Sequence, residues 1–238
     1  MVPFCSRITD GRFQFDGRQI QLPPNNPPGK HAIHGQGFQG CWQLLEQLEN
    51  SLTLAFTHEP AAWPWHYTVE LTATLIRRQL EINVCVANRS TQSMPLGVGL
   101  HPFFPRTPRM IVSALTTHQL MLDDEGLPIA ISEIPNELNM QPPMALANLV
   151  LDHVFLGWNG RTNLFWPEHK TSLCLSAAKS SRGLVVWAPA NEKFVCIEPV
   201  TNLPDAFNHA DQPFGGFEVL AAGQKFCASW RLSPKFED

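Results

Sequence analysis

The 238-residue sequence lacks long apolar runs, a secretory signal and an excess of basic residues, and each absence excludes a class of protein. No apolar run approaches the roughly 20 residues that span a bilayer. The start, MVPFCSRITDGRF, has no basic region followed by an apolar stretch, so we expect no secretion. The net charge is -4, the pI is about 6.1, and Lys and Arg are scattered. We therefore expect neither a nucleic-acid partner nor a membrane partner.

The six cysteines include no CxxC pair, which argues against the commonest metal and redox motifs. They are Cys5, Cys41, Cys85, Cys174, Cys196 and Cys227. Cys85, Cys174 and Cys196 lie within apolar, strand-like runs, which favours buried free thiols in a cytoplasmic protein. A disulfide framework is the alternative.

Helical periodicity is scarce, and alternation with a period of two dominates the chain. It is clearest in SLTLAFTHE (51–59), HYTVELTATL (66–75) and LEINVCVANRS (80–90), the last two of which predict a long hairpin. A short helical turn is expected only in PPMALANLVLD (142–152). The 21 prolines and 15 glycines suit the turns of an all-β fold. We predict one large antiparallel sandwich domain over residues 1–238.

Two histidines, His31 and His34, lie in the stretch GKHAIHGQGF (29–38). Their spacing would suit a metal, but no cysteine or acidic ligands cluster beside them, so we expect no metal site. They are either loop histidines in a tight turn or part of a binding site. Gly35, next to His34, would let a ligand approach the backbone closely.

The stretch MPLGVGLHPFF (94–104) has two very different faces if it is a strand. One face is apolar, and the other carries Gly97 and Gly99 with almost no side-chain bulk before His101. Such glycines need a compensating reason, such as a ligand or a second backbone lying close. His101 therefore lies either in a binding cleft or at a tight contact between sheets.

Two carboxylates interrupt apolar runs. Asp152 lies in LVLDHVFLGW (149–158), where it is either a buried, paired carboxylate or a turn residue at the start of a strand. Glu198 lies in FVCIEPVTNLPDAFN (194–208) and continues an apolar strand face, so desolvation should raise its pKa and make it a better base near neutral pH. The alternative is a glutamate at the sheet rim that water satisfies. Pro199 lacks an N–H group, so we expect the strand to end there.

Taken together and in order, these motifs resemble the aldose 1-epimerase (galactose mutarotase-like) family over nearly the whole chain. The matching segments are Ser6-Arg7-Ile8, Gly11, Phe15-Asp16-Gly17, His34-Gly35, WPWHY, GLHPFF, LDDEGLP, LDHVF and IEPVTNLPDAFN. The resemblance implies a large antiparallel β-supersandwich with an open active-site cleft, no cofactor and no metal.

The resemblance also implies roles for five residues. Arg7 and His34 would bind sugar hydroxyls, Asp152 would hydrogen-bond to further hydroxyls, His101 would be the general acid at the ring oxygen, and Glu198 would be the general base on the anomeric hydroxyl. Opening a cyclic hemiacetal requires one proton to be taken from O1 and one to be given to O5, and each positioned transfer is worth roughly 100- to 10,000-fold. We therefore expect an aldose 1-epimerase that interconverts the α and β anomers of a hexose, as a monomer or homodimer.

Three features depart from the family pattern. Gln36 replaces the second glycine after the family's histidine, and GLHPFF replaces the asparagine-histidine-threonine-tyrosine form of the galactose enzymes, which leaves the sugar open. Family members usually carry a few dozen residues before the arginine motif. The early position of Arg7 therefore implies a misassigned start or an N-terminally shortened sandwich with exposed strand edges.

Two alternative functions remain at this stage. A hexose-6-phosphate epimerase of the same fold would need a cationic pocket, to which Arg106 or Arg109 could contribute. A non-catalytic carbohydrate-binding domain would need aromatic platforms, for which Trp63, Trp65 and Trp158 are the candidates.

Overall fold

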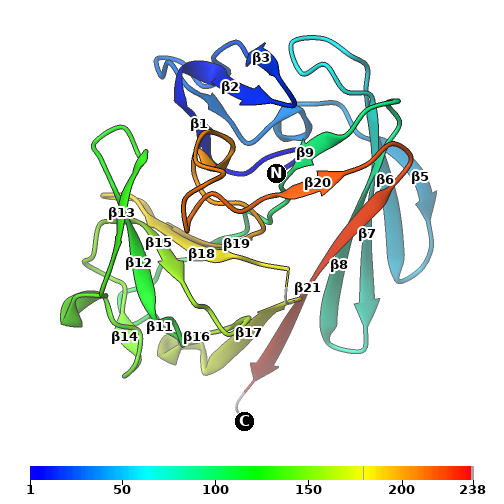
Figure 1. Ribbon diagram of the computed structural model, residues 1–238. Helices are drawn as coiled ribbons and strands as arrows, with labels where there is room; N and C mark the ends of the chain where they lie inside the picture. The colour runs from blue at the N-terminus through cyan, green and yellow to red at the C-terminus, as the bar shows by residue number, and fades with distance from the viewer. Residues whose placement is uncertain (179, 237–238) are drawn as a thin grey trace.

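The computed structural model describes residues 1–178 and 180–236, and strands make up nearly all of their regular structure (Figure 1). The helices are three-residue 3₁₀ turns: η1 (Thr9–Gly11), η2 (Gln36–Phe38), η3 (Asn136–Leu138), η4 (Pro167–His169) and η5 (Ala206–Asn208). Among these described residues, no helix has the length and apolar character that crossing a membrane requires. The prediction of an all-β fold with large antiparallel sheets is confirmed.

The larger sheet has nine strands in the order β14-β11-β16-β17-β21-β8-β7-β6-β5. Its strands are β5 (Gln43–Gln47), β6 (Ser51–His58), β7 (Tyr67–Ile76), β8 (Gln79–Asn88), β11 (Ile111–Ala114), β14 (Met144–Ala145), β16 (Arg161–Trp166), β17 (Thr171–Ala177) and β21 (Lys225–Phe236). The predicted hairpin is present as β7 and β8, which pair along their whole length.

The smaller sheet has six strands in the order β10-β19-β18-β15-β12-β13. Its strands are β10 (Phe103–Pro105), β12 (His118–Leu122), β13 (Pro128–Ser132), β15 (Leu151–Leu156), β18 (Gly183–Ala188) and β19 (Phe194–Val200). Three two-stranded pairs complete the fold: β1 (Arg7–Ile8) with β4 (Ala32–Ile33), β2 (Arg12–Phe15) with β3 (Arg18–Gln21), and β9 (Met94–Leu96) with β20 (Glu218–Leu220).

One face of the six-stranded sheet packs against the nine-stranded sheet. Val195 and Ile197 of β19 enter this core together with Leu164 and Leu175 of the larger sheet. Because side chains alternate along a strand, Cys196 and Glu198 must point to the opposite face. The sandwich core therefore determines which face of β19 is left for chemistry.

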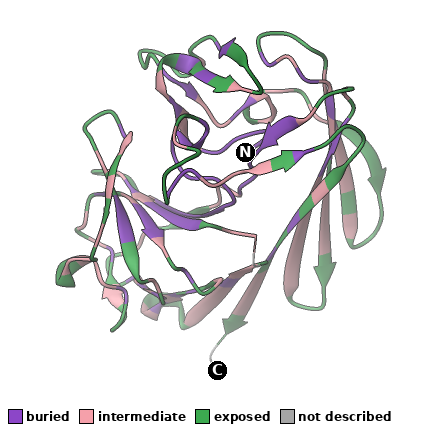
Figure 2. Ribbon diagram, in the orientation of Figure 1, coloured by how far each residue is buried: buried purple, intermediate pink, exposed green. Residues whose placement is uncertain are grey.

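The opposite face of the six-stranded sheet is covered by the N-terminal segment and by the loop that follows β19. Val154 and Val185 lie on this face and pack with Cys5 of the segment and Leu203 of the loop. In Figure 1 the blue N-terminal strands lie above β15, β18 and β19. Figure 2 shows that buried residues are concentrated where these parts meet. The face that carries Glu198 is thus largely shielded from water.

Strand β5 forms an exposed edge of the nine-stranded sheet. All five of its residues are exposed, and Leu44 and Leu45 are more than half exposed. A register shift between Leu44 and Glu46 interrupts its pairing with β6. Such a bulge weakens an edge as a template for pairing with another chain.

The prediction of free thiols is wrong for Cys85. This residue forms a disulfide with Cys227, because β8 and β21 are neighbours whose register places the two cysteines opposite each other, with Cα atoms 4.1 Å apart. The other cysteines of the described residues are free, and of the two remaining predicted buried thiols Cys196 is buried and Cys174 is half-buried. The expectation of a cytoplasmic protein loses the support that it took from free thiols.

Residues 94–104 do not form the continuous strand that their alternation suggested. Only Met94–Leu96 and Phe103–Pro105 are strands, and the segment between them is irregular. A Cβ on Gly97 would lie 1.8 Å from the Asn202 side chain, and one on Gly99 would lie 2.7 Å from the Cys5 sulfur. The glycines therefore allow close packing of protein against protein, and the binding-cleft explanation is not needed for them.

Residues 142–152 contain no helix, although a hydrogen bond from the Leu149 N–H group to the Leu146 carbonyl closes a single turn there. Met144–Ala145 form the short strand β14, which pairs with β11 at the edge of the larger sheet. The apolar residues of this stretch serve the sandwich core instead, since Leu146 and Leu151 are both buried there. Pairing with the sheet edge overrides a weak local helical signal.

Candidate active site

Glu198 and His101 meet on the covered face of the six-stranded sheet. An oxygen of Glu198, Oε1, lies 3.2 Å from Nε2 of His101, and the two side chains are 5% and 22% exposed. His101 comes from the irregular segment before β10, which is fixed beside β19 by a hydrogen bond from the Leu100 N–H group to the Pro199 carbonyl. A carboxyl group and an imidazole are thus within proton-transfer distance.

The prediction that β19 ends at Pro199 is wrong. The strand continues to Val200, and Pro199 pairs in register with Leu184 of β18. The nitrogen and carbonyl of one residue in an antiparallel strand face the same neighbour. Since the Pro199 carbonyl faces Leu100, its nitrogen also faces that irregular segment, where the lost N–H group breaks no ladder hydrogen bond.

The sheet register explains which side chains surround the pair. Phe103 is opposite Cys196, Cys196 is opposite Trp187, and Trp187 is opposite Asp152, so these four side chains form one row on the site face. Glu198 lies two residues beyond Cys196 on the same face. The predicted residue Asp152 therefore reaches the site from β15, two strands away from Glu198.

Arg7 is brought over Asp152 by the small β1–β4 pair. A guanidinium nitrogen, Nη2, lies 3.9 Å from Oδ2 of Asp152. The register of this pair places Arg7 opposite Ile33, directly before His34. The N-terminal arginine and the histidine-glycine motif thus arrive together.

His34 faces His101, with ring centroids 5.4 Å apart. Its Nδ1 atom accepts a hydrogen bond from the Ser6 N–H group, which leaves Nε2 for another partner. The next residue, Gly35, has a φ of 71°, and a Cβ there would lie 2.2 Å from the Val2 carbonyl oxygen. Gly35 thus serves chain packing, while Gln36, the departure from the family pattern, accepts a hydrogen bond from the Tyr67 hydroxyl.

The polar loop after Glu198 fixes the N-terminal segment in place. Asn202 accepts a hydrogen bond from the Cys5 N–H group at 2.8 Å and donates one to the Cys5 carbonyl at 3.2 Å. Asp205 accepts hydrogen bonds from both the backbone N–H and the hydroxyl of Thr9. The two anchored residues, Cys5 and Thr9, lie two positions before and two positions after Arg7. The loop therefore positions the arginine over the site.

Burial disfavours charge on both members of the pair. It raises the pKa of Glu198 to about 8, with a further contribution from the nearby Asp152 carboxylate that the N-terminal amino group and Arg7 partly offset. Burial also lowers the pKa of His101 below its usual value. Near neutral pH the two groups therefore hold one proton between them.

The other predicted site residues are also shifted by burial. It raises the pKa of Asp152, against the attraction of Arg7 and His153, and it lowers the pKa of His34 to about 3, assisted by His101 and Arg7. His34 is thus a neutral imidazole at physiological pH. A neutral imidazole can donate or accept a hydrogen bond, as recognition of a hydroxyl group requires.

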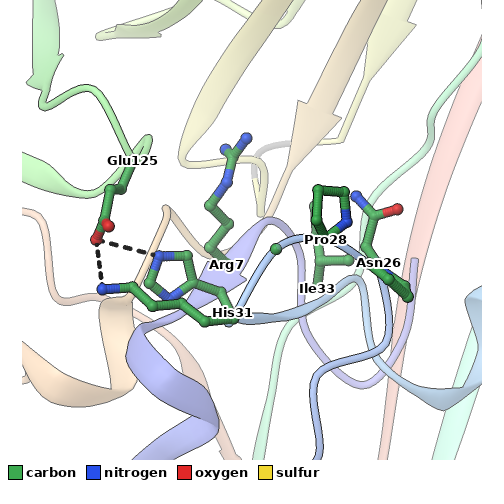
Figure 3. A pocket seen from close by; sticks show the side chains of 9 residues that line it. Arg7, Asn26, Pro28, His31, Ile33 and Glu125 are labelled. Carbon is green, nitrogen blue, oxygen red and sulfur yellow. Dashed lines mark ion pairs between the residues drawn. The ribbon is translucent and has the colours of Figure 1, made fainter.

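Arg7 lies between two solvent-accessible cavities. One, of about 450 Å³, is lined by residues 26–31, Ile33 and Glu125. Figure 3 shows His31 beside Glu125, and Lys30 also pairs with Glu125, at 3.0 Å. The other, of about 370 Å³, includes Asp152 and residues 119–124. Neither is lined by His101 or Glu198.

An aromatic cluster borders His101. Phe103 stacks on the imidazole with centroids 5.1 Å apart and is 59% exposed, and Trp187 meets the same ring edge-on. No local pattern singles out either residue, because the strand register that aligns them is non-local. The predicted platforms Trp63, Trp65 and Trp158 are instead buried, the first two in the core beneath the N-terminal segment.

Comparison with known proteins identifies a family for this chain. Residues 1–233 match the model of the family Aldose 1-epimerase. The uncharacterised Escherichia coli K12 protein YphB is 28% identical over 98% of this chain and 81% of its own length. The aldose 1-epimerase of the same organism is 27% identical over 56% of this chain and 39% of its own.

Solved structures give the same fold. A candidate aldose 1-epimerase from Escherichia coli K12 superposes with a TM-score of 0.91 at 26% identity, covering 99% of this chain and 82% of that one. A galactose mutarotase-like protein from Clostridium acetobutylicum gives 0.88 at 19% identity, covering 98% and 78%. Since the family match extends over nearly the entire sequence, the chain belongs to the aldose 1-epimerase family.

Proposed function

We propose that this protein is an aldose 1-epimerase that interconverts the α and β anomers of an unphosphorylated hexose, with Glu198 as general base and His101 as general acid. The observation that carries the proposal is the 3.2 Å separation of the two groups on a shielded sheet face. Family membership supports the reaction class, and Asp152, Arg7 and His34 lie where sugar hydroxyls would be bound.

Ring opening uses the single proton of the pair. As the sugar binds, the proton moves from Glu198 to His101. The imidazolium that forms is stabilised by the Glu198 carboxylate beside it. Glu198 takes the proton from O1 while His101 gives its proton to O5, and the C1–O5 bond breaks. The products are the open aldehyde, a neutral carboxyl group and a neutral imidazole, so no net charge develops in the buried site.

Ring closure reverses these roles. Rotation about the C1–C2 bond presents the other face of the aldehyde to the O5 hydroxyl. His101 then takes the O5 proton and Glu198 returns its proton to the carbonyl oxygen, which becomes O1 of the opposite anomer. The pair is then again an imidazolium and a carboxylate, as it was before ring opening, and the shared proton returns to Glu198 when the sugar leaves.

The open-chain sugar has to stay anchored while C1 rotates. Arg7 and Asp152 offer charged hydrogen-bonding partners beside the two cavities, and charge-assisted hydrogen bonds are the stronger ones. His34 offers a neutral partner next to His101. The exposed face of Phe103 suits the apolar C–H face of a pyranose ring.

Two observations disfavour a phosphorylated substrate. Arg106 uses its guanidinium group to donate hydrogen bonds to the backbone carbonyls of Leu146, Leu149 and Pro189. Arg109 is paired with Glu168 and is largely exposed. The two arginines that a hexose-6-phosphate epimerase would use are thus committed elsewhere.

The remaining alternative, a non-catalytic carbohydrate-binding domain, was based on exposed tryptophan platforms, and the structure does not provide them. Trp63 and Trp65 are almost completely buried and Trp158 is 9% exposed, so none of them offers a platform to a sugar. Burying the Glu198 carboxyl group costs folding free energy. A domain that only binds sugar gains nothing in return for this cost, whereas an enzyme gains a base.

Polarimetry across a panel of aldoses tests this proposal. Freshly dissolved α-D-glucose and α-D-galactose should reach anomeric equilibrium faster with the protein than in buffer alone. Glucose-6-phosphate, followed by exchange NMR, should show a much smaller acceleration. Acceleration confined to the phosphorylated sugar would favour the hexose-6-phosphate epimerase instead.

A further inference from the structure

Cys196 places a third metal-ligating atom beside the catalytic pair. Its sulfur, a ring nitrogen of His101 and a carboxylate oxygen of Glu198 all lie within 4.8 Å of one another. Cys196 is a free, fully buried thiol on the same strand face as Glu198. The ring-opening reaction proposed above assigns no task to this thiol.

The arrangement suits a tetrahedral cation with mixed ligands. Zinc lies about 2.0 to 2.3 Å from nitrogen, oxygen and sulfur ligands, which places neighbouring ligand atoms about 3.3 to 3.8 Å apart. The 3.2 Å between His101 and Glu198 is already close to that spacing. The sulfur needs to approach by only about an ångström to complete a three-ligand set.

We propose that His101, Cys196 and Glu198 form a binding site for a thiophilic divalent cation of the Zn²⁺ class, and that the bound ion switches off ring opening. Imidazole, thiolate and carboxylate are the donor types that zinc prefers, whereas Mg²⁺ prefers oxygen ligands alone. On binding, the thiol proton and the proton shared by the pair leave to solvent. The resulting thiolate and carboxylate neutralise the charge of the ion within the buried site.

The inhibition, unlike the binding, rests on the proposed function. Because the cation takes the same nitrogen and oxygen atoms that exchange protons with the sugar, cation and sugar exclude each other. Zinc should therefore act as a competitive inhibitor with respect to the aldose.

The binding test uses the full chain, freed of metal by a chelator, and zinc chloride titrated against a chromophoric competitor. The wild-type protein should bind one zinc ion. Loss of a residue that only hydrogen-bonds to a metal ligand costs roughly 10- to 100-fold in metal affinity. Cys196 is proposed as a direct ligand, so Cys196→Ser and Cys196→Ala should each weaken zinc binding at least about 10-fold. The alanine variant is included because a hydroxyl group is harder to bury at this position than a methyl group. Cys41→Ser, which changes an exposed thiol, should bind as the wild type does.

The kinetic test compares mutarotation with and without zinc. Wild-type activity should fall as zinc rises and recover with more sugar. Cys196→Ala, compared with its own rate in the absence of zinc, should lose most of this sensitivity. Magnesium chloride should have no effect. Equal zinc affinity in wild type and both folded Cys196 variants would overturn the proposed site. Zinc binding that depends on Cys196 in a protein without mutarotase activity would keep the site and reject only the proposed function.

Discussion

The Nε2 atom of His101 lies 3.2 Å from the Oε1 atom of Glu198, although the two residues come from different segments of the chain. Burial raises the pKa of the carboxyl group and lowers that of the imidazole, so the pair retains one proton near neutrality. A pair in this state can give a proton to one oxygen of a hemiacetal and take one from the other.

Replacing His101 with glutamine removes the proposed acid while retaining a polar side chain. We expect kcat/KM for mutarotation to fall by roughly 100- to 10,000-fold, the usual contribution of one positioned proton transfer. The far-UV circular dichroism spectrum should not change, because His101 lies outside the strands. His118→Gln, at an exposed position of β12, is the matched control and should keep the wild-type rate. Similar rates for the two variants would remove His101 from the mechanism.

The pH dependence of kcat/KM should be bell-shaped, because only the pair with one proton is active. The basic limb should fall near pH 8, where the pair loses its shared proton, since the pKa of Glu198 is raised to about 8. The acidic limb should lie below the usual pKa of histidine, since burial lowers the pKa of His101. Steady-state polarimetry from acid to alkaline buffers, corrected for the spontaneous rate, measures both limbs. An ordinary carboxyl and imidazole pair would lose its proton below pH 7. A basic limb that falls there instead of near pH 8 would contradict this assignment.

Changing Asp152 to asparagine should move the basic limb toward lower pH. The Asp152 carboxylate raises the pKa of Glu198, so its removal should let Glu198 lose its proton more easily. The same change should raise KM, because Arg7 loses its partner in the site. Asp211→Asn, an exposed position in the loop before β20, serves as the charge control. If the basic limb stays in place while KM rises, Asp152 binds sugar without acting on Glu198.

Changing Asn202 to alanine should destabilise the protein. Asn202 satisfies both the N–H group and the carbonyl of Cys5, and each buried polar group left without a partner costs about 1 to 3 kcal/mol. Urea unfolding should therefore show a lower midpoint, whereas Asn50→Ala, in an exposed turn, should leave it nearly unchanged. Loss of the Cys5 anchor should also raise KM, since Arg7 lies two residues further along. An unchanged midpoint would show that the loop does not hold the N-terminal segment.

Local patterns in the sequence predicted much of the fold and the position of the central carboxylate. The alternation in residues 66–90 predicted the β7–β8 hairpin, and the alternation in residues 194–198 placed Cys196 and Glu198 on one face. These predictions succeed because a side-chain period of two follows from strand geometry alone.

Non-local pairing accounts for what the sequence did not predict. The Cys85–Cys227 disulfide depends on β8 and β21 being neighbours, which no local signal specifies. Pro199 remains inside its strand because its nitrogen faces the irregular segment at Leu100, where the missing N–H group breaks no ladder hydrogen bond. Trp187 borders the site only because the register aligns it with Cys196 and Asp152.

The loop after Glu198 illustrates the same limit. Asn202 and Asp205 in this loop are buried and hold the N-terminal segment. A buried asparagine or aspartate needs partners, and the sequence does not say which segment supplies them. The three-dimensional partner of this loop is the segment that carries Arg7.

Anomer exchange of glucose at pH 7, measured by magnetisation-transfer NMR, tests the role of Glu198 most directly. The wild-type protein and Glu192→Gln, an exposed position just before β19, should both accelerate exchange between the α and β signals. Glu198→Gln should leave the exchange rate close to that of buffer, with its fold intact by circular dichroism. Exchange by folded Glu198→Gln at the wild-type rate would contradict the assignment of this carboxylate as the base that opens the sugar ring.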